Sequence, residues 1–178
     1  MPRLFAGIEV PRDIALGLSM LRGGLPGARW IDLENYHITL RFIGDVDGRI
    51  ANDVADMLAR VRRRPMTLRL DGLDAFGGKK PRAIVARIAH TPDLMALQME
   101  TEQIIQRSGL PPEGRKFTPH VTLARLRDAN QMAVADYLSV RGSYASLPFT
   151  VSRFVLFSAQ PFSGGGPYVV EEAYPLAA

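Results

Sequence analysis

His37-Ile38-Thr39-Leu40 and His120-Val121-Thr122-Leu123 are two nearly identical stretches of this chain of 178 residues. Each tetrad reads histidine, β-branched residue, threonine, leucine, and together they contain two of the three histidines. Apolar and polar residues alternate in both, which is typical of a half-buried strand. Because successive strand side chains point to opposite faces, each tetrad predicts an imidazole and a hydroxyl side by side. Two such strands facing one cleft would surround a small anion with two proton-transfer groups and two hydroxyl donors.

The elements expected around the two tetrads follow the order strand, helix, tetrad strand, helix, strand in both halves of the chain. Apolar spacing and glycine or proline breaks predict a first set at residues 4–10, 12–25, 37–43, 50–61 and 66–71. A second set is predicted at 83–89, 92–108, from 120 onward, 130–140 and 149–157, before a turn at 163–167 and a last strand at 168–174. The distance from Leu4 to His37 is 33 residues, and that from Ile84 to His120 is 36. This near-equality indicates a duplicated unit.

This order of elements predicts an α+β fold. We expect a bilobal molecule with two antiparallel sheets backed by helices, related by a pseudo-two-fold and separated by a central cleft. Residues 1–178 would form a single domain of two interleaved lobes, with sequence halves at about 1–78 and 79–178.

Composition restricts the class of protein. The 47% hydrophobic content allows a sizeable core, and no apolar run reaches the roughly 18 residues of a membrane span. The short apolar start is interrupted by Glu9 and does not resemble a secretory signal. Absence of cysteine excludes disulfides, thiolate nucleophiles and cysteine-ligated metals. We therefore expect a cytoplasmic protein with no membrane partner.

The net charge of +4 and the pI of 9.8 suit a polyanionic partner such as RNA. A general bias toward arginine explains the same charge equally well. The charge alone therefore leaves the partner open.

Other kinds of site fit the tetrads less well. Ordinary strand histidines that bond to the backbone would not be expected to recur in matching context. A zinc site would need one or two further ligands, and neither tetrad has a carboxylate on its cleft face. The chain has no Gly-x-Ser-x-Gly elbow, and the glycines at 164–166 lie between strands, which indicates a turn rather than a phosphate-binding loop.

General acid–base chemistry by two histidines fits best. Histidine titrates near neutral pH, so one imidazole can be neutral while the other is protonated. This division suits in-line displacement at phosphorus, in which one side activates water and the other protonates the departing oxygen. The hydroxyls of Thr39 and Thr122 would hold the non-bridging oxygens. Neither a metal nor another cofactor is needed if the substrate is strained, as a five-membered cyclic phosphate is.

Three blocks of the chain, at residues 3–11, 34–44 and 117–125, resemble the two-histidine phosphoesterases. More narrowly, they resemble the RNA 2′,3′-cyclic phosphodiesterases, also called 2′-5′ RNA ligases. The resemblance implies a bilobal α+β fold and hydrolysis of a 2′,3′-cyclic phosphate to a 2′-phosphate. It implies that His37 is the proton donor and His120 the proton acceptor. It also implies that Thr39 and Thr122 bind phosphate.

Two arginines are candidates for substrate binding. Strand alternation places Arg41 on the cleft face, where it could contact a phosphate, although a solvated surface arginine is equally compatible. Alternation points Arg125 away from His120, whereas the resemblance favours a position near the anion.

Other residues have plainer explanations. Lys79, Lys80 and Arg82 could follow an RNA backbone or could simply be solvated. His90 lacks the tetrad and is expected at the surface or at a helix cap.

Base stacking is possible at three aromatic residues, Tyr36, Phe42 and Tyr168, with core packing favoured for Phe42. The chain departs from the family at Ala86, where relatives often have an aromatic residue that could also stack. It departs again at Gly77, where proline is frequent, which bears only on the shape of a loop.

The sequence thus predicts a monomeric, metal-independent enzyme whose partner is RNA or an oligonucleotide with a cyclic phosphate end. Ligation forming a 2′-5′ bond and hydrolysis of a small cyclic nucleotide remain open for the same site. A non-catalytic RNA-binding module is an alternative of another class. Such a module would bind RNA in a salt-sensitive way that survives loss of His37 and His120.

Overall fold

The computed structural model describes residues 3–160 and 166–177 of the chain. The elements of these described residues are, in chain order, β1 (Arg3–Glu9), α1 (Arg12–Ser19), β2 (Ala28–Trp30), the 3₁₀ helix η1 (Leu33–Asn35), β3 (His37–Asp45), α2 (Gly48–Leu58), β4 (Met66–Leu68), β5 (Leu70–Phe76), β6 (Ala83–Ile88), α3 (Pro92–Arg107), β7 (His120–Leu126), α4 (Gln131–Arg141), β8 (Phe149–Val151), β9 (Arg153–Ala159) and β10 (Tyr168–Pro175). Of the turn expected at 163–167, residues 163–165 lie outside the described residues.

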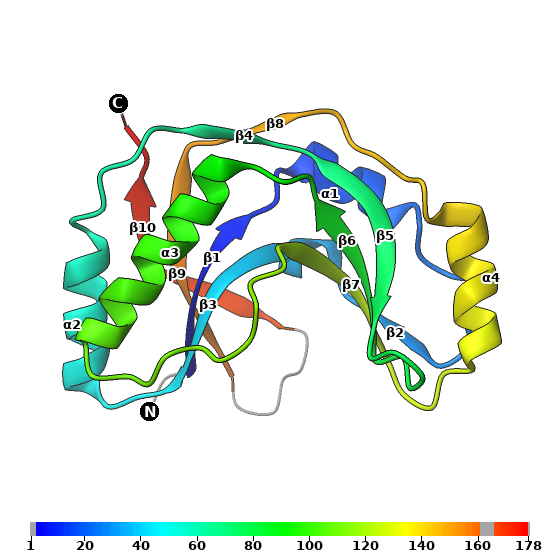
Figure 1. Cartoon of the computed structure of the whole chain (residues 1–178), viewed down its shortest axis with the longest axis horizontal. Helices are drawn as coiled ribbons and strands as arrows, with labels where there is room; N and C mark the ends of the chain where they lie inside the picture. The colour runs from blue at the N-terminus through cyan, green and yellow to red at the C-terminus, as the bar shows by residue number, and fades with distance from the viewer. Residues whose placement is uncertain (1–2, 161–165, 178) are drawn as a thin grey trace.

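The strands form one large antiparallel sheet and a two-stranded ribbon. The sheet has the order β10-β9-β1-β3-β7-β6-β5, with β2 beside β7, and β4 pairs with β8 in the ribbon. The register of β3 and β7 contains a single residue pair, Ile38 with Val121. The sheet therefore divides into two arms at this junction (Figure 1). The predicted α+β fold with antiparallel strands in two lobes is confirmed.

The two halves of the chain repeat the same pairing. β1 lies between β3 and β9, and β6 lies between β7 and β5. Each arm is therefore completed by a strand from the other half, since β5 ends the first set and β9 ends the second. The strands predicted at 66–71 and 149–157 each divide, at Arg69 and Ser152, into a ribbon strand and a sheet strand. This equivalent division agrees with a duplicated unit.

The first helix is shorter than the sequence predicts. α1 ends at Ser19 because the next three backbone N–H groups bond to carbonyls three residues back instead of four. Gly23 and Gly24 follow with φ of 97° and 74°, which turns the chain toward β2. No helix of the described residues is long and apolar enough to cross a membrane.

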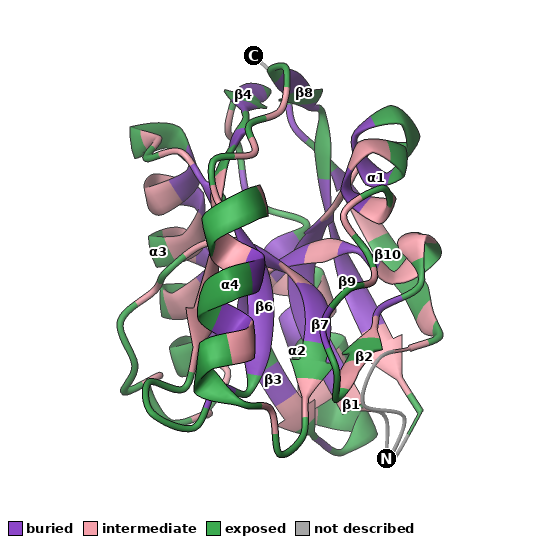
Figure 2. Ribbon diagram, turned by 90° about the vertical axis from the view of Figure 1, so that its right-hand side faces the viewer, coloured by how far each residue is buried: buried purple, intermediate pink, exposed green. Residues whose placement is uncertain are grey.

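The main core lies between the sheet and the helices. One hydrophobic cluster extends under both arms and includes the fully buried Ile38 and Leu123 of the tetrad strands. A smaller cluster of Phe5, Val155 and Phe157 is separate from it. Figure 2 shows that buried residues are concentrated in the strands, while much of α4 is exposed. The buried residues of each tetrad thus anchor its strand and leave the histidine and threonine for the other face.

A β-bulge follows the threonine of each tetrad. Leu40 is an extra residue opposite β1, because the residues on either side of it pair with consecutive residues of that strand. Leu123 is extra in the same way opposite β6. A bulge shifts the alternation by one position. Phe42 and Arg125, three residues beyond each threonine, therefore turn toward the histidine face, whereas Arg41 turns toward α3.

Gly7 lies where β1 passes the first bulge. A Cβ there would lie 2.7 Å from the carbonyl oxygen of Ile38 and 3.2 Å from a ring carbon of Phe157. We expect Gly7→Ala to lower the free energy of unfolding by about 1–3 kcal/mol in urea denaturation, because the backbone must shift. Gly48→Ala is the matched control, since a Cβ at Gly48 meets nothing within 4 Å and should not destabilise the protein. Equal stability of the Gly7 variant and the wild type would contradict this close approach.

Candidate active site

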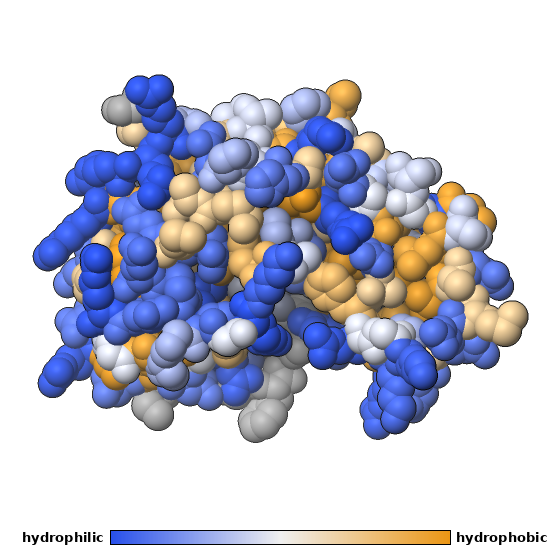
Figure 3. Space-filling view, in the orientation of Figure 1, coloured by the Kyte–Doolittle hydropathy of each residue, from blue (hydrophilic) through white to orange (hydrophobic). Residues whose placement is uncertain are grey.

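Both tetrads line one cavity at the junction of the two arms. The cavity has a volume of about 650 Å³, and its lining includes His37, Thr39, His120 and Thr122. The single pair that joins β3 to β7, Ile38 with Val121, brings the histidine and threonine of one tetrad beside those of the other. In Figure 3, hydrophilic side chains gather on both sides of the notch between the arms. The structure therefore brings the imidazoles and hydroxyls of the two halves together.

Each imidazole is oriented by a backbone carbonyl two residues before it. His37 Nδ1 lies 2.9 Å from the carbonyl oxygen of Asn35, and His120 Nδ1 lies 2.7 Å from that of Thr118. Because a carbonyl can only accept, Nδ1 carries the proton in both rings, and the neutral form has its lone pair on Nε2. Thr39 Oγ1 donates to Nε2 of His37 at 3.1 Å. Both rings thus present Nε2 for proton transfer.

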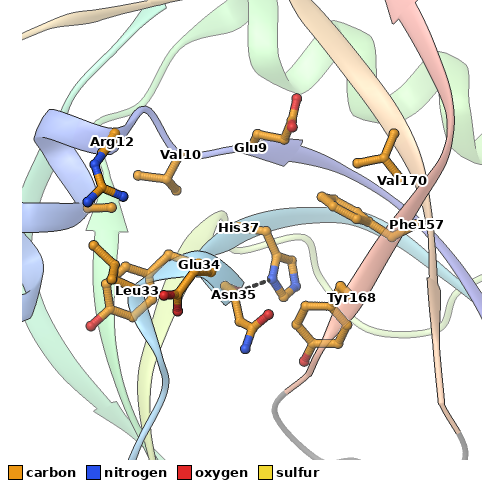
Figure 4. A pocket seen from close by; sticks show the side chains of 12 residues that line it. Glu9, Val10, Arg12, Leu33, Glu34, Asn35, His37, Phe157, Tyr168 and Val170 are labelled. Atoms are coloured by element: carbon orange, nitrogen blue, oxygen red, sulfur yellow. Dashed lines mark hydrogen bonds between the residues drawn. The ribbon is translucent and has the colours of Figure 1, made fainter.

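The two histidines differ in their aromatic surroundings. The ring of His37 lies 4.9 Å from the rings of Phe5 and Tyr168, and 5.6 Å from that of Phe157. Figure 4 shows Phe157 and Tyr168 beside His37. His120 packs edge-on against Phe76 at 4.8 Å. Tyr168 comes from β10, which extends one arm beyond β9, whereas β5 is the outermost strand of the other arm.

Burial favours the neutral form of both histidines in the free protein. Burial lowers the pKa of His37 from 6.5 to about 4, against the opposing bond to Asn35, and the charges of His120 and Arg125 contribute in the same direction. Burial also lowers the pKa of His120, against its bond to Thr118, and Arg125 contributes again. A phosphate anion between the rings would favour the imidazolium form and so raise both pKa values.

Arg125 lines the cavity, although simple alternation points it away from His120. The bulge at Leu123 explains the difference. The charge of Arg125 lowers the pKa values of His37, His120 and Tyr168, so it lies close to all three. Within the described part of the chain, no carboxylate pairs with its guanidinium. A positive charge is therefore available where an anion between the imidazoles would lie.

Arg41 borders the same cavity, but its guanidinium is engaged by the protein. It donates to the carboxylate of Glu102 and to the carbonyl oxygens of Phe42 (2.6 Å) and Pro111 (2.5 Å). Its side chain is 8% exposed, so the alternative of a solvated surface arginine is wrong. The bulge at Leu40 is the cause, because it turns Arg41 from the cleft toward α3.

Other candidates from the sequence lie at different depths. Arg82 lines the cavity, while Lys79 and Lys80 are exposed in the turn between β5 and β6. Phe42 is 47% exposed and lines the cavity, so the expectation of core packing is wrong. Tyr36 is 4% exposed and belongs to the main core, which leaves its ring no room to stack on a base.

Most of one cavity wall was not indicated by the sequence, since only Phe117 and Thr118 of this wall belong to the block at 117–125. It is formed by the loop of residues 108–119 between α3 and β7, which contributes the cavity-lining residues Glu113, Arg115, Lys116, Phe117 and Thr118. This loop has no hydrophobic periodicity. Its position directly before the second tetrad is the signal that could have indicated the remaining residues of this wall.

A smaller pocket lies beside His37. Its volume is about 210 Å³, and it shares Asn35, His37 and Tyr168 with the main cavity (Figure 4). Among the residues the structure describes, no three histidine, aspartate or glutamate side chains come together in a way that could hold a metal ion.

Comparison with known proteins gives matches along most of the chain. A family model described as LigT-like phosphoesterase matches residues 8–85 and 88–168. An RNA 2′,3′-cyclic phosphodiesterase from Aeropyrum pernix is 35% identical over 116 residues, which cover 64% of this chain and 65% of that protein. Another, from Thermotoga maritima, is 28% identical over 179 residues, which cover 94% of this chain and 92% of the relative.

Solved structures match the complete fold. The crystal structure of Escherichia coli LigT complexed with 3′-AMP superposes with a TM-score of 0.84 at 26% identity and covers 100% of both chains. The structure of TT0787 from Thermus thermophilus has a TM-score of 0.79 at 22% identity and covers 98% and 97% of the two chains, which shows a shared fold.

Proposed function

Because the chain belongs to the LigT-like phosphoesterase family, we propose that it hydrolyses the 2′,3′-cyclic phosphate at an RNA end to a 2′-phosphate. The observation that carries the proposal is the convergence of both tetrads on one cavity, with each Nδ1 bonded to a carbonyl. The relatives named RNA 2′,3′-cyclic phosphodiesterases support the choice of substrate.

The proposed reaction is an in-line displacement at phosphorus. His120 Nε2 accepts a proton from water as the water oxygen bonds to phosphorus. The bond from phosphorus to the 3′ oxygen breaks, and protonated His37 gives that oxygen its Nε2 proton. The hydroxyls of Thr39 and Thr122 donate to the non-bridging oxygens, and the charge of Arg125 stabilises the negative transition state.

The cavity suits an RNA end. Arg82, Lys116 and Arg125 add positive charge to its lining, and the exposed ring of Phe42 offers a surface on which a base can stack. We infer that the chain acts as a single domain and a monomer in the cytoplasm, without a metal or another cofactor.

A labelled oligoribonucleotide with a 2′,3′-cyclic phosphate end tests the proposal. The expected product is the 2′-phosphate, identified by mass and by comparison with 2′- and 3′-phosphate standards. A chelator should not change the rate. A 3′-phosphate product, or RNA binding that persists without hydrolysis, would contradict the proposed reaction.

Two further assays separate reactions within the same site. A cyclic mononucleotide with the same end shows whether the RNA chain contributes to kcat/KM. Supplying an RNA with a free 5′-hydroxyl shows whether a 2′-5′ bond forms. We expect the rate of hydrolysis to exceed the rate of ligation. We also expect kcat/KM for the oligonucleotide to exceed kcat/KM for the cyclic mononucleotide.

A further inference from the structure

A largely buried ion pair links the first tetrad strand to the loop before the second tetrad. Arg41 on β3 and Glu102 on α3 have side chains that are 8% and 15% exposed. We propose that this is a positioning pair, which holds the loop of residues 108–119, and through it His120, in the geometry that hydrolysis needs. The inference rests on the proposed function and gives Arg41 a role other than phosphate binding.

Both members of the pair bond to the loop. Arg41 donates to the carbonyl oxygen of Pro111 (2.5 Å), and Glu102 accepts from the backbone N–H of Glu113 (2.9 Å). Glu102 also accepts from Arg41 and from Gln106 Nε2 (2.8 Å). Although burial raises the pKa of Glu102, these donors keep it below its usual value, so the carboxylate stays charged.

Other support for the loop comes from its two ends. Ile88 N–H donates to the carbonyl oxygen of Pro119 at 3.3 Å, and Leu110 and Phe117 pack against the main core. In the described part of the chain, the hydrogen bonds that tie residues 111–118 to elements outside the loop are those to Arg41, Glu102 and His120. The segment before the first tetrad is different, because η1 holds itself together, for example through Asn35 N–H donating to the carbonyl oxygen of Asp32 at 2.9 Å. The loop before the second tetrad contains no such helical turn. The ion pair of Arg41 and Glu102 supplies the support that the turn gives to the first tetrad.

The position of the loop matters to the site in two ways. Thr118 supplies the carbonyl oxygen that accepts from His120 Nδ1 and sets the orientation of the ring. Arg115, Lys116 and Phe117 form part of the cavity wall. A displacement of about 1 Å in a catalytic group can cost about a hundredfold in rate, so a released loop should be detected in kcat.

The fold itself does not require an ion pair at this place. The position after the bulge of the second half is Ala124, which is 0% exposed. Apolar residues can often replace a buried ion pair without loss of stability, so stability alone is a weak reason to bury Arg41. What distinguishes the first half is the contact with the loop.

Two single variants distinguish positioning from phosphate binding. If the pair positions the loop, Arg41→Met and Glu102→Ala should both lower kcat about tenfold to a hundredfold, with a smaller change in KM. Amide hydrogen exchange over residues 108–119 should become faster in both variants. The double variant should be no worse than the more affected single variant, because the two side chains act as one unit.

Glu100→Ala is the matched control. Glu100 lies on the same helix and pairs with Arg63, whose side chain is 35% exposed, but that pair makes no bond to the loop. Its kcat and loop exchange should match the wild type. If Glu102→Ala or Arg41→Met folds poorly, Glu102→Gln keeps the size of the side chain and should show a smaller change in the same direction.

The outcomes separate the inference from the proposed function. If Arg41 were a phosphate ligand, Arg41→Met would lose affinity for inorganic phosphate while Glu102→Ala, which frees the guanidinium, would keep or gain it; that result overturns the inference. Unchanged kcat and unchanged loop exchange in folded variants overturn it as well. A wild-type protein that does not hydrolyse cyclic phosphate ends refutes the proposed function, whereas hydrogen exchange still tests the loop.

Discussion

Replacing either tetrad histidine by alanine is expected to lower kcat by about 10²–10⁴-fold, because each ring performs one proton transfer of the proposed reaction. His37→Ala leaves the departing 3′ oxygen without a proton donor, and His120→Ala leaves the attacking water without a base. Single-turnover hydrolysis of labelled RNA measures the loss. Thermal melting of each variant shows whether the protein remains folded.

The third histidine provides the control. His90 is exposed between β6 and α3, as the sequence predicts, and His90→Ala should retain the wild-type rate. The variant lacking both tetrad histidines should be little slower than either single variant, because the two proton transfers belong to one displacement. Single variants that both keep more than a tenth of the rate would contradict acid–base catalysis by the tetrads.

The tetrads and the order of elements could be predicted because their signals are local. Two-residue alternation indicates strands. The apolar side chains of Ile38 and Val121 are expected to face the core, which places each preceding histidine on the opposite face. The spacing of elements from Leu4 to His37 and from Ile84 to His120 indicated the duplication. By contrast, the exchange of β5 and β9 between the arms depends on pairing between distant segments, which no local pattern encodes.

The bulges are the main feature that strand alternation could not reveal. Leu40 and Leu123 look like ordinary inward-facing residues of a strand, yet each is an extra residue in its ladder. The resulting shift reverses the expected orientation of Arg125, buries Arg41 against α3 and exposes Phe42 in the cavity. A bulge arises from the fit between two strands, and neither strand's sequence contains that information by itself.

The pH dependence of kcat/KM is the second large expected effect. This ratio reports the ionisation of the free protein, in which the pKa of His37 lies at about 4 and that of His120 lies below 6.5. The proposed reaction needs His37 protonated and His120 neutral. The fraction of protein molecules in which the two histidines together hold one proton therefore declines as pH rises through and beyond 6.5, by about tenfold per pH unit. We expect kcat/KM to be highest below pH 6.5.

Arg125 gives a test of the cause. Its charge lowers the pKa values of both histidines, so Arg125→Gln should move the alkaline limb of kcat/KM to higher pH, even though the rate itself falls. Arg82→Gln is the comparison, because Arg82 lines the cavity but does not contribute to either histidine's pKa shift. Equal shifts in both variants, or none, would contradict this assignment.

A bound anion should oppose the effect of burial on the pKa values of the two histidines. Its negative charge lies between the imidazoles and favours the imidazolium, so the pKa that governs kcat should be higher than the one that governs kcat/KM. Binding of sulfate, an anion of similar shape that does not titrate near pH 7, should then take up protons from solution. Calorimetry in buffers of different ionisation enthalpy measures this uptake directly. The contrary result is that no protons are taken up and that kcat/KM is level between pH 6 and 8. The free protein would then already hold the proton that the departing oxygen receives. In that case, burial of His37 among Phe5, Phe157 and Tyr168 would not control its protonation.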